Sequence, residues 1–127
     1  MKIISSDSVR TDNDFEQGLS VIFAVNDETC GAQKITTGRT SVAPGGRNDP
    51  HYHPNSEAVM YIIRGQVKMT SGTGDKRIEY IAKPGDFIYV PRMEIHGVVN
   101  CSETETAEWI FMYGGVPNKE AAGIVFV

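Results

Sequence analysis

The apolar residues of this chain occur in short runs, and each run ends at a turn-forming sequence. Because few windows of eleven or more residues keep a helical period, these runs are predicted to be strands. Eight runs follow one another along the chain: Leu19–Val25, Lys34–Val42, Ala58–Ile63, Gln66–Thr70, Arg77–Ala82, Phe87–Val90, Gly97–Val99 and Ala107–Tyr113. Short strands at this spacing predict an all-β sandwich or barrel.

Two segments lie outside this strand pattern. Pro117–Gly123 begins with proline and ends with glycine, which predicts a single turn of helix. Residues 1–18 are polar and acidic over most of their length, and they are predicted to form a loose arm or an edge strand exchanged with a partner subunit. With 127 residues and a mass of 13.9 kDa, the chain fits one domain over residues 1–127.

Charge and hydropathy argue against several classes of partner. The chain has 12 basic and 16 acidic residues, so a dedicated nucleic-acid-binding surface is not expected. Its longest apolar runs, such as Val59–Ile63, are far shorter than the roughly 20 residues of a spanning helix, so no membrane partner is expected. Because the first residues lack a secretory pattern, a cytoplasmic location is expected.

The three histidines of the chain are the strongest indication of chemistry. His51 and His53 are two residues apart, so on a strand their side chains share one face at a separation of about 6.5 to 7 Å. His96 can reach the same point from a neighbouring strand if the sheet closes. Imidazole sets of this kind suit Zn, Fe, Ni or Cu, whereas two solvated polar residues on a strand are the alternative interpretation.

The residues around these histidines resemble the two sequence motifs of the cupin family. The first motif is matched, in its spacing, by Gly45, His51, His53, Glu57 and Gly65. The second motif is matched by Gly85, Pro91, His96 and Asn100. The resemblance covers a core over residues 45–100. It implies a jelly-roll barrel, also called a double-stranded β-helix, with one divalent metal ion held by the three histidines.

The family's glutamate ligand is the point at which this sequence departs from the pattern. Counted forward from His53, Glu57 fits a shorter variant of the motif; counted back from Gly65, the usual position is Ala58. A one-residue offset on a strand turns a side chain to the opposite face unless a β-bulge absorbs it. Glu57 is therefore a candidate fourth ligand, with an outward-facing carboxylate as the alternative.

Four further residues are candidates for the substrate pocket. If Ala58 faces inward, Met60 and Ile62 follow by alternation and form an apolar wall. Arg47 could orient an anionic substrate, or it is a solvated surface residue. Met93 stands where the second motif usually has glycine, and its thioether is expected either near the pocket mouth or as a filler of the core.

The resemblance also implies a class of function. A three-histidine site leaves positions on the metal for water, dioxygen or substrate, and it is similar to the site of iron-dependent cupin dioxygenases. Iron is therefore expected first, with zinc, nickel or manganese as alternatives. The expected protein is a metal-dependent homodimeric enzyme acting on a small organic substrate, dioxygenase-type before isomerase, lyase or decarboxylase. A non-catalytic small-ligand binding or sensor cupin is the alternative.

Overall fold

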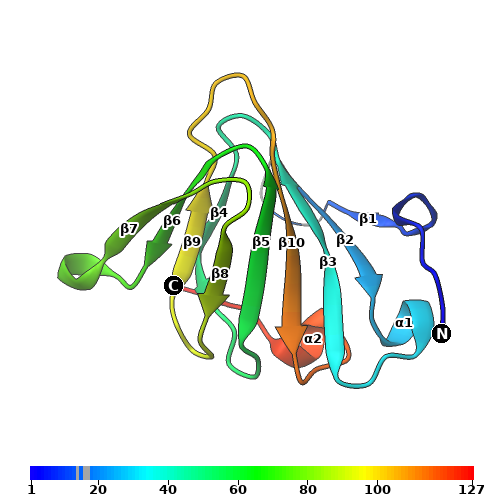
Figure 1. Cartoon of the computed structure of the whole chain (residues 1–127). Helices are drawn as coiled ribbons and strands as arrows, with labels where there is room; N and C mark the ends of the chain where they lie inside the picture. Colours follow the sequence, from blue (N-terminus) through cyan, green and yellow to red (C-terminus); the bar gives the residue numbers. More distant parts are fainter. Residues whose placement is uncertain (14, 16–17) are drawn as a thin grey trace.

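Two antiparallel sheets lie face to face and form the body of the molecule (Figure 1). This computed structural model describes residues 1–13, 15 and 18–127. The six-stranded sheet has the spatial order β1 (Thr11–Asp12), β2 (Leu19–Val25), β3 (Ile35–Val42), β10 (Ala107–Gly114), β5 (Ala58–Arg64), β8 (Phe87–Val90). The five-stranded sheet has the order β11 (Val125–Phe126), β4 (Arg47–Tyr52), β9 (His96–Val99), β6 (Val67–Ser71), β7 (Ile78–Ala82). Single helical turns flank these strands: η1 (Ser6–Ser8), α1 (Asp27–Cys30), η2 (Gly74–Lys76) and α2 (Lys119–Ala122).

The all-β prediction is confirmed, and the sheets form a jelly roll. Each of the eight predicted strands is present with ends that agree within one residue, and α2 is the predicted single helical turn. Strand β4 was not predicted, because its sequence is polar and contains Pro50, which has no N–H to donate. The pairing of β4 with β9 shifts register between Asn48 and His51, and this irregularity accommodates the proline.

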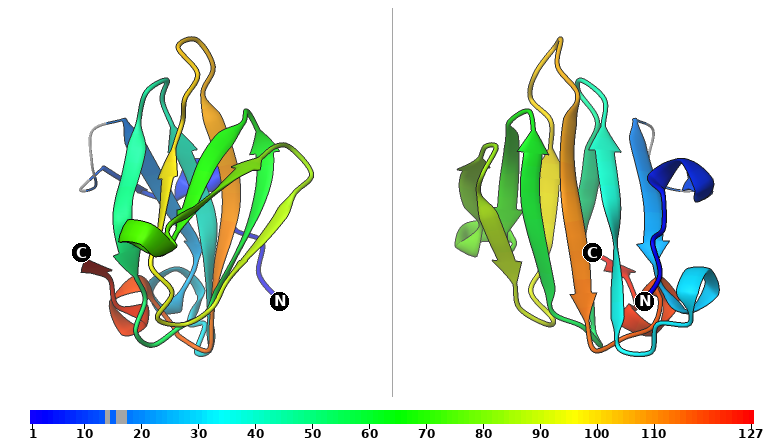
Figure 2. Two further views of the ribbon diagram at one scale, coloured as in Figure 1. Left: turned by 90° about the vertical axis from the view of Figure 1, so that its left-hand side faces the viewer. Right: turned by 45° about the vertical axis from the view of Figure 1, so that its right-hand side comes forward.

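Figure 2 shows the two sheets from two further directions. The hydrophobic core lies between them, where the inward-facing side chains of both layers meet. Val42, Ile62, Val67 and Val98 are at most 2% exposed, and buried residues alternate with more exposed ones along β3 and most of β5. Burial of each such side chain stabilises the fold by about 1.5 to 3 kcal/mol relative to exposure. The period-two pattern that predicted the strands is therefore also the pattern that fills the sandwich.

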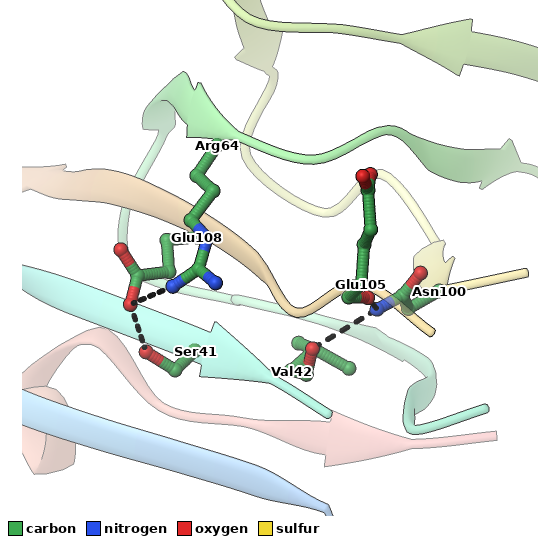
Figure 3. A network of polar contacts seen from close by, with 6 residues as sticks. All are labelled: Ser41, Val42, Arg64, Asn100, Glu105 and Glu108. Atoms are coloured by element: carbon green, nitrogen blue, oxygen red, sulfur yellow. Dashed lines mark hydrogen bonds and ion pairs between the residues drawn. The ribbon is translucent and has the colours of Figure 1, made fainter. Parts of the chain in front are cut away.

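A buried asparagine joins three chain segments at one end of the sandwich (Figure 3). The side-chain amide of Asn100 donates to the carbonyl oxygens of Val42 at 3.0 Å, Ala43 at 3.3 Å and Glu105 at 2.7 Å. Asn100 directly follows β9, whereas His96 begins that strand. The asparagine therefore holds the end of the barrel opposite to the histidines.

The predicted N-terminal arm is partly described. Its strand β1 pairs with β2 of the same chain at the edge of the six-stranded sheet, and residues 14, 16 and 17 of the arm lie outside the described residues. Exchange of this strand with a partner subunit stays a prediction. Within the described part of the chain, no helix combines the length and the apolar character needed to cross a membrane.

Candidate metal centre

The fold brings the three histidines together at one end of the sandwich. His51 lies near the end of β4, His53 follows that strand, and His96 begins β9 directly opposite His51. One nitrogen from each ring can be chosen so that all three lie within 4.8 Å of one another. All three residues are buried, with exposures of 2%, 6% and 8% in that order. Residues 45 positions apart in the sequence thus form one compact donor set.

Each histidine ring is held by a hydrogen bond from its Nδ1 atom to a backbone carbonyl. The acceptors are Asp49 O at 2.7 Å for His51, Gly123 O at 2.6 Å for His53 and Glu94 O at 2.9 Å for His96. A carbonyl oxygen only accepts, so each Nδ1 carries the proton and each Nε2 keeps its lone pair. Such a hydrogen bond fixes both the tautomer and the ring orientation of a metal-binding histidine.

The surroundings keep these rings neutral. Burial lowers the pKa of His51 to about 3, and the neighbouring His96 adds to this effect because a second positive charge disfavours protonation. Burial also lowers the pKa of His53 and of His96. Neutral imidazole is the form that binds a metal ion, so the site does not need to lose protons at neutral pH before binding one.

The donor set fits a single transition-metal ion. Three neutral imidazoles suit iron, zinc or nickel better than magnesium or calcium, which prefer oxygen ligands. Three protein ligands also leave positions on the metal for water or substrate. His51, His53 and His96 are the residues that would hold the ion.

Glu57, the candidate fourth ligand, lies outside this donor set. Its side chain is exposed, and its carboxylate accepts a hydrogen bond of 2.8 Å from the Tyr89 hydroxyl. Ala58, the position obtained by counting back from Gly65, is buried and lines the histidine cavity. The register shift of β5 against β10 lies beyond Tyr61, near Arg64, so it does not turn Glu57 inward.

The histidines face a small apolar cavity of about 60 Å³ between the sheets. Its aromatic lining includes Phe23, Trp109, Phe111 and Tyr113. Among the described lining residues, no lysine, arginine, aspartate or glutamate is present. The ring of Tyr113 lies 4.8 Å from that of His53, and burial raises the pKa of its hydroxyl to about 12. The cavity therefore favours uncharged groups.

The predicted pocket residues divide between the cavity and other places. Met60 lines the cavity, whereas Ile62 is fully buried in the core beyond it. Arg47 is exposed and its guanidinium contacts the Asp49 carboxylate at 2.6 Å. Arg47 is thus not among the described cavity-lining residues, because β4 turns its side chain to the surface.

Met93 is also placed differently from the pocket-mouth expectation. It is 52% exposed and lies outside the described lining of the histidine cavity. Its φ angle is +72°, in the left-handed region that favours glycine. The backbone N–H of Met93 donates to the carbonyl of His53 at 3.1 Å, so this strained turn supports the backbone beside a metal-site histidine.

Asn48 is a cavity residue that the sequence pattern did not indicate. It lies on β4 three residues before His51 and lines the same cavity. Its Oδ1 atom is buried, and none of the described residues donates a hydrogen bond to it. A buried acceptor without a partner costs about 1 to 3 kcal/mol, which favours a role toward a bound molecule. The polar sequence of β4 carries no signal that separates Asn48 from its neighbours.

A jelly roll with a buried set of three neutral imidazoles defines a metal-binding β-barrel protein. The sequence model of the Cupin domain matches residues 38–113, which is more than half of the chain. The chain therefore belongs to the cupin family.

Relatives and solved structures agree with this assignment. The chain is 30% identical over 97 residues to Germin-like protein 3-5 of Oryza sativa subsp. japonica, and 26% identical over the same length to Oxalate oxidase GF-3.8 of Triticum aestivum. These matches cover 73% of the chain but only 40% and 41% of the relatives. The chain thus spans about two fifths of the curated relatives it matches.

Among solved structures, the polyketide cyclase RemF from Streptomyces resistomycificus has a TM-score of 0.80 at 21% identity, covering 100% of this chain and 85% of that protein. An oxalate oxidase structure has a TM-score of 0.78 at 22% identity, covering 98% of this chain and 63% of that protein. At such identities the likeness concerns the fold.

Proposed function

We propose that this cupin is a mononuclear metal-dependent enzyme acting on a small organic substrate, with dioxygenase-type chemistry as the favoured reaction. The observation that carries the proposal is the set of three buried histidines whose Nδ1 protons are all held by backbone carbonyls. Since Glu57 lies outside the set, the proposed ligands are His51, His53 and His96 alone, and iron is the favoured metal.

The residues of the chain supply positioning and exclusion of water. When bound, the metal would supply Lewis-acid and oxygen-activating chemistry. The three histidines would hold it at one point between the sheets, and the aromatic side chains keep bulk water away from the site. Asn48 Oδ1 accepts a hydrogen bond from a hydroxyl or N–H of the substrate. Because the described lining has no cationic side chain, the reacting group of the substrate is proposed to be uncharged.

The first experiment is elemental analysis of the protein purified without an affinity tag or added metal. The expected result is about one equivalent of iron. His51→Ala should lower metal affinity by more than the ten- to 100-fold typical of losing a supporting hydrogen bond. Glu57→Gln is the matched control and should keep full occupancy, because this carboxylate contacts Tyr89 instead of the histidines.

Three outcomes of the metal measurement would redirect the proposal. Zinc, nickel or manganese in place of iron would contradict the dioxygenase assignment and favour isomerase, lyase or decarboxylase chemistry. Loss of metal in Glu57→Gln would contradict the three-histidine ligand set. Absence of any metal, together with no uptake on titration, would contradict the metal-dependent function itself. An iron-bound protein would then be screened for oxygen consumption with small phenols and diketones.

A non-catalytic binding cupin is the second candidate, and one observation favours it. Among the described residues that line the cavity, Tyr113 is the only side chain besides the histidines with a titratable proton, and its pKa is raised to about 12. A reaction that needs a protein acid or base has no other group here. Ligand binding without product under both air and nitrogen would support this candidate.

The oligomeric state, the location and the domain organisation of the protein stay proposals. Each sheet ends on one side in a strand of only two residues, β1 or β11, and coverage of such an edge by a second copy supports the proposed homodimer. Sedimentation as a 13.9 kDa species at all concentrations would contradict it. The cytoplasmic location and the single domain over residues 1–127 stay predictions from the sequence.

A further inference from the structure

The two sheets separate at the edge formed by β7 and β8, which the chain connects through residues 83–86. Tyr80 pairs with Met69 across β6 and β7 and has the same parity as Ala82, so its side chain is on the inward-facing side of its sheet. Met69 and Ala82 are each 4% exposed, whereas Tyr80 is 53% exposed. The sandwich is therefore not filled at this edge.

The unfilled space is a cleft of about 340 Å³, within the usual range for small-molecule sites. Met69, Ser71 and Tyr80 line it from the five-stranded sheet, and Ile88 and Val90 line it from β8. Ile88 pairs with Met60 and packs against the core, which confirms that it also faces inward. The cleft is thus a continuation of the barrel interior.

The cleft reaches the histidine site. His96 contributes to its lining and also to the lining of the 60 Å³ cavity that contains His51 and His53. At the same end, the Ser71 hydroxyl donates a hydrogen bond to the Glu94 carboxylate, so both polar groups already have partners. A molecule in the cleft would therefore meet apolar walls first and the metal-site histidine at its inner end.

The charges around the cleft restrict what can bind. Its described lining includes the carboxylates of Asp86 and Glu94 and no lysine or arginine. An anionic ligand would be desolvated beside like charges, which is unfavourable. An uncharged ring system avoids this cost and buries apolar surface against Tyr80 and Ile88.

We propose that the cleft between β7 and β8 binds the ring-bearing, uncharged part of the substrate and directs its reacting group toward the histidines. This inference rests on the proposed function, since it assigns a substrate class to the same site. Tyr80 and Ile88 are then specificity-determining residues, and a small dianion such as oxalate is a poor ligand.

The test uses 2-naphthol as the probe and naphthalene-2-carboxylate as a matched anion, each titrated into the metal-free protein. Binding is followed by the amide shifts of the ¹⁵N-labelled chain. The expected shifts concentrate at Met69, Tyr80, Ile88 and His96, and 2-naphthol binds at least ten times more tightly than the carboxylate. Ile88→Trp, which fills the cleft, and Tyr80→Ala, which removes one wall, each weaken 2-naphthol at least tenfold.

Ile110→Ala is the control, because Ile110 is 39% exposed on the outer face of the six-stranded sheet and is not among the described residues that line the cleft. This variant should leave the affinity unchanged. Shifts confined to that outer face, equal affinity for the two probes, or unchanged affinity in Tyr80→Ala would overturn the proposal. A change in molar mass on Tyr80→Ala would also overturn it, since it would assign the cleft to a second copy.

Metal uptake, measured separately, distinguishes this inference from the proposed function. Binding of 2-naphthol in the cleft of a protein that takes up no metal would contradict the metal-dependent function and support the cleft as a ligand site. Metal uptake without 2-naphthol binding would contradict the cleft assignment alone.

Discussion

At the scale of single residues, the site depends on hydrogen bonds that orient side chains. The imidazole rings of His51 and His96 bond to carbonyls two residues earlier, so β4 and the turn before β9 orient them locally. His53 instead bonds to Gly123, 70 positions later in the sequence. The loop after α2 is thus part of the metal site although it contributes no ligand.

The buried Oδ1 atom of Asn48, which has no hydrogen-bond donor among the described residues, leads to a prediction in which stability and function change in opposite directions. Asn48→Leu removes a buried acceptor that has no partner among the described residues, and it preserves the approximate volume. The free energy of unfolding is expected to rise by about 1 kcal/mol, whereas substrate binding weakens. Urea denaturation measures the first effect and ligand titration the second. If Asn48→Leu lowered the free energy of unfolding and also weakened ligand binding, the role of Asn48 would be merely structural.

At the scale of elements, close contact between strands constrains particular positions. Gly38 lies on β3, and a Cβ atom there would be 1.8 Å from the carbonyl oxygen of Ile22 and 2.9 Å from the ring of Phe111. The β2–β3 pairing and the packing of Phe111 against Phe23 therefore require glycine at this position.

Gly38→Ala is expected to destabilise the protein by about 3 kcal/mol or more, because backbone atoms would have to move. Arg39→Ala, one residue later and on the opposite face of β3, is the control and should change stability by no more than about 0.5 kcal/mol. Chemical denaturation of both variants checks the difference. Similar denaturation midpoints for Gly38→Ala and Arg39→Ala would contradict the close contact between β2 and β3 at Gly38.

Asn100 joins elements at the end of the barrel opposite to the metal site. Its side chain is 1% exposed, and Asn100→Ala would leave the carbonyls of Val42 and Glu105 without their donor. The expected loss of stability is about 2 to 3 kcal/mol, with no change in metal affinity. Denaturation and metal titration of the same variant test both statements.

The nearby pair in Figure 3 provides the comparison. Arg64 lies 3.9 Å from the Glu108 carboxylate, and its side chain is 62% exposed. Because exposed ion pairs contribute little, Arg64→Ala should cost at most about 1 kcal/mol. If Asn100→Ala and Arg64→Ala lowered the stability equally, the hydrogen bonds of the buried Asn100 amide would not be the main interaction that joins these segments.

At the scale of the whole molecule, the neutral histidines link folding to pH. Burial lowers the pKa of all three, to about 3 for His51, while the unfolded chain protonates near 6.5. Below pH 6.5 the unfolded chain therefore binds more protons than the folded one. The stability that these groups contribute is complete above pH 6.5 and is lost as the pH falls toward their folded values.

The metal-free protein is accordingly expected to lose up to about 1.4 kcal/mol per pH unit through His51 between pH 6.5 and 5, and His53 and His96 add to this loss in the same direction. Urea denaturation at pH 7.5, 6.5, 5.5 and 5 measures this slope. A His51→Gln variant should show a smaller slope, because glutamine does not titrate. A stability independent of pH in this range would contradict burial of the neutral rings.

The sequence by itself determined eight of the strands, the jelly-roll class and the identity of the three histidines. These features depend on local information: apolar runs at period two, turn residues between them, and residue types at motif spacing. The position of Glu57 was ambiguous, because counting from His53 and counting from Gly65 gave opposite faces of the strand.

Only the tertiary structure decided on which face Glu57 lies. It also placed Arg47 at the surface and Met93 outside the cavity, and it brought Asn48 and Gly123 beside the histidines. It also left the β7–β8 edge open, with Tyr80 half exposed on an inward face. The physical reason is that these features depend on register shifts and on contacts between residues far apart in the sequence. Local patterns carry no information about which distant backbone will approach.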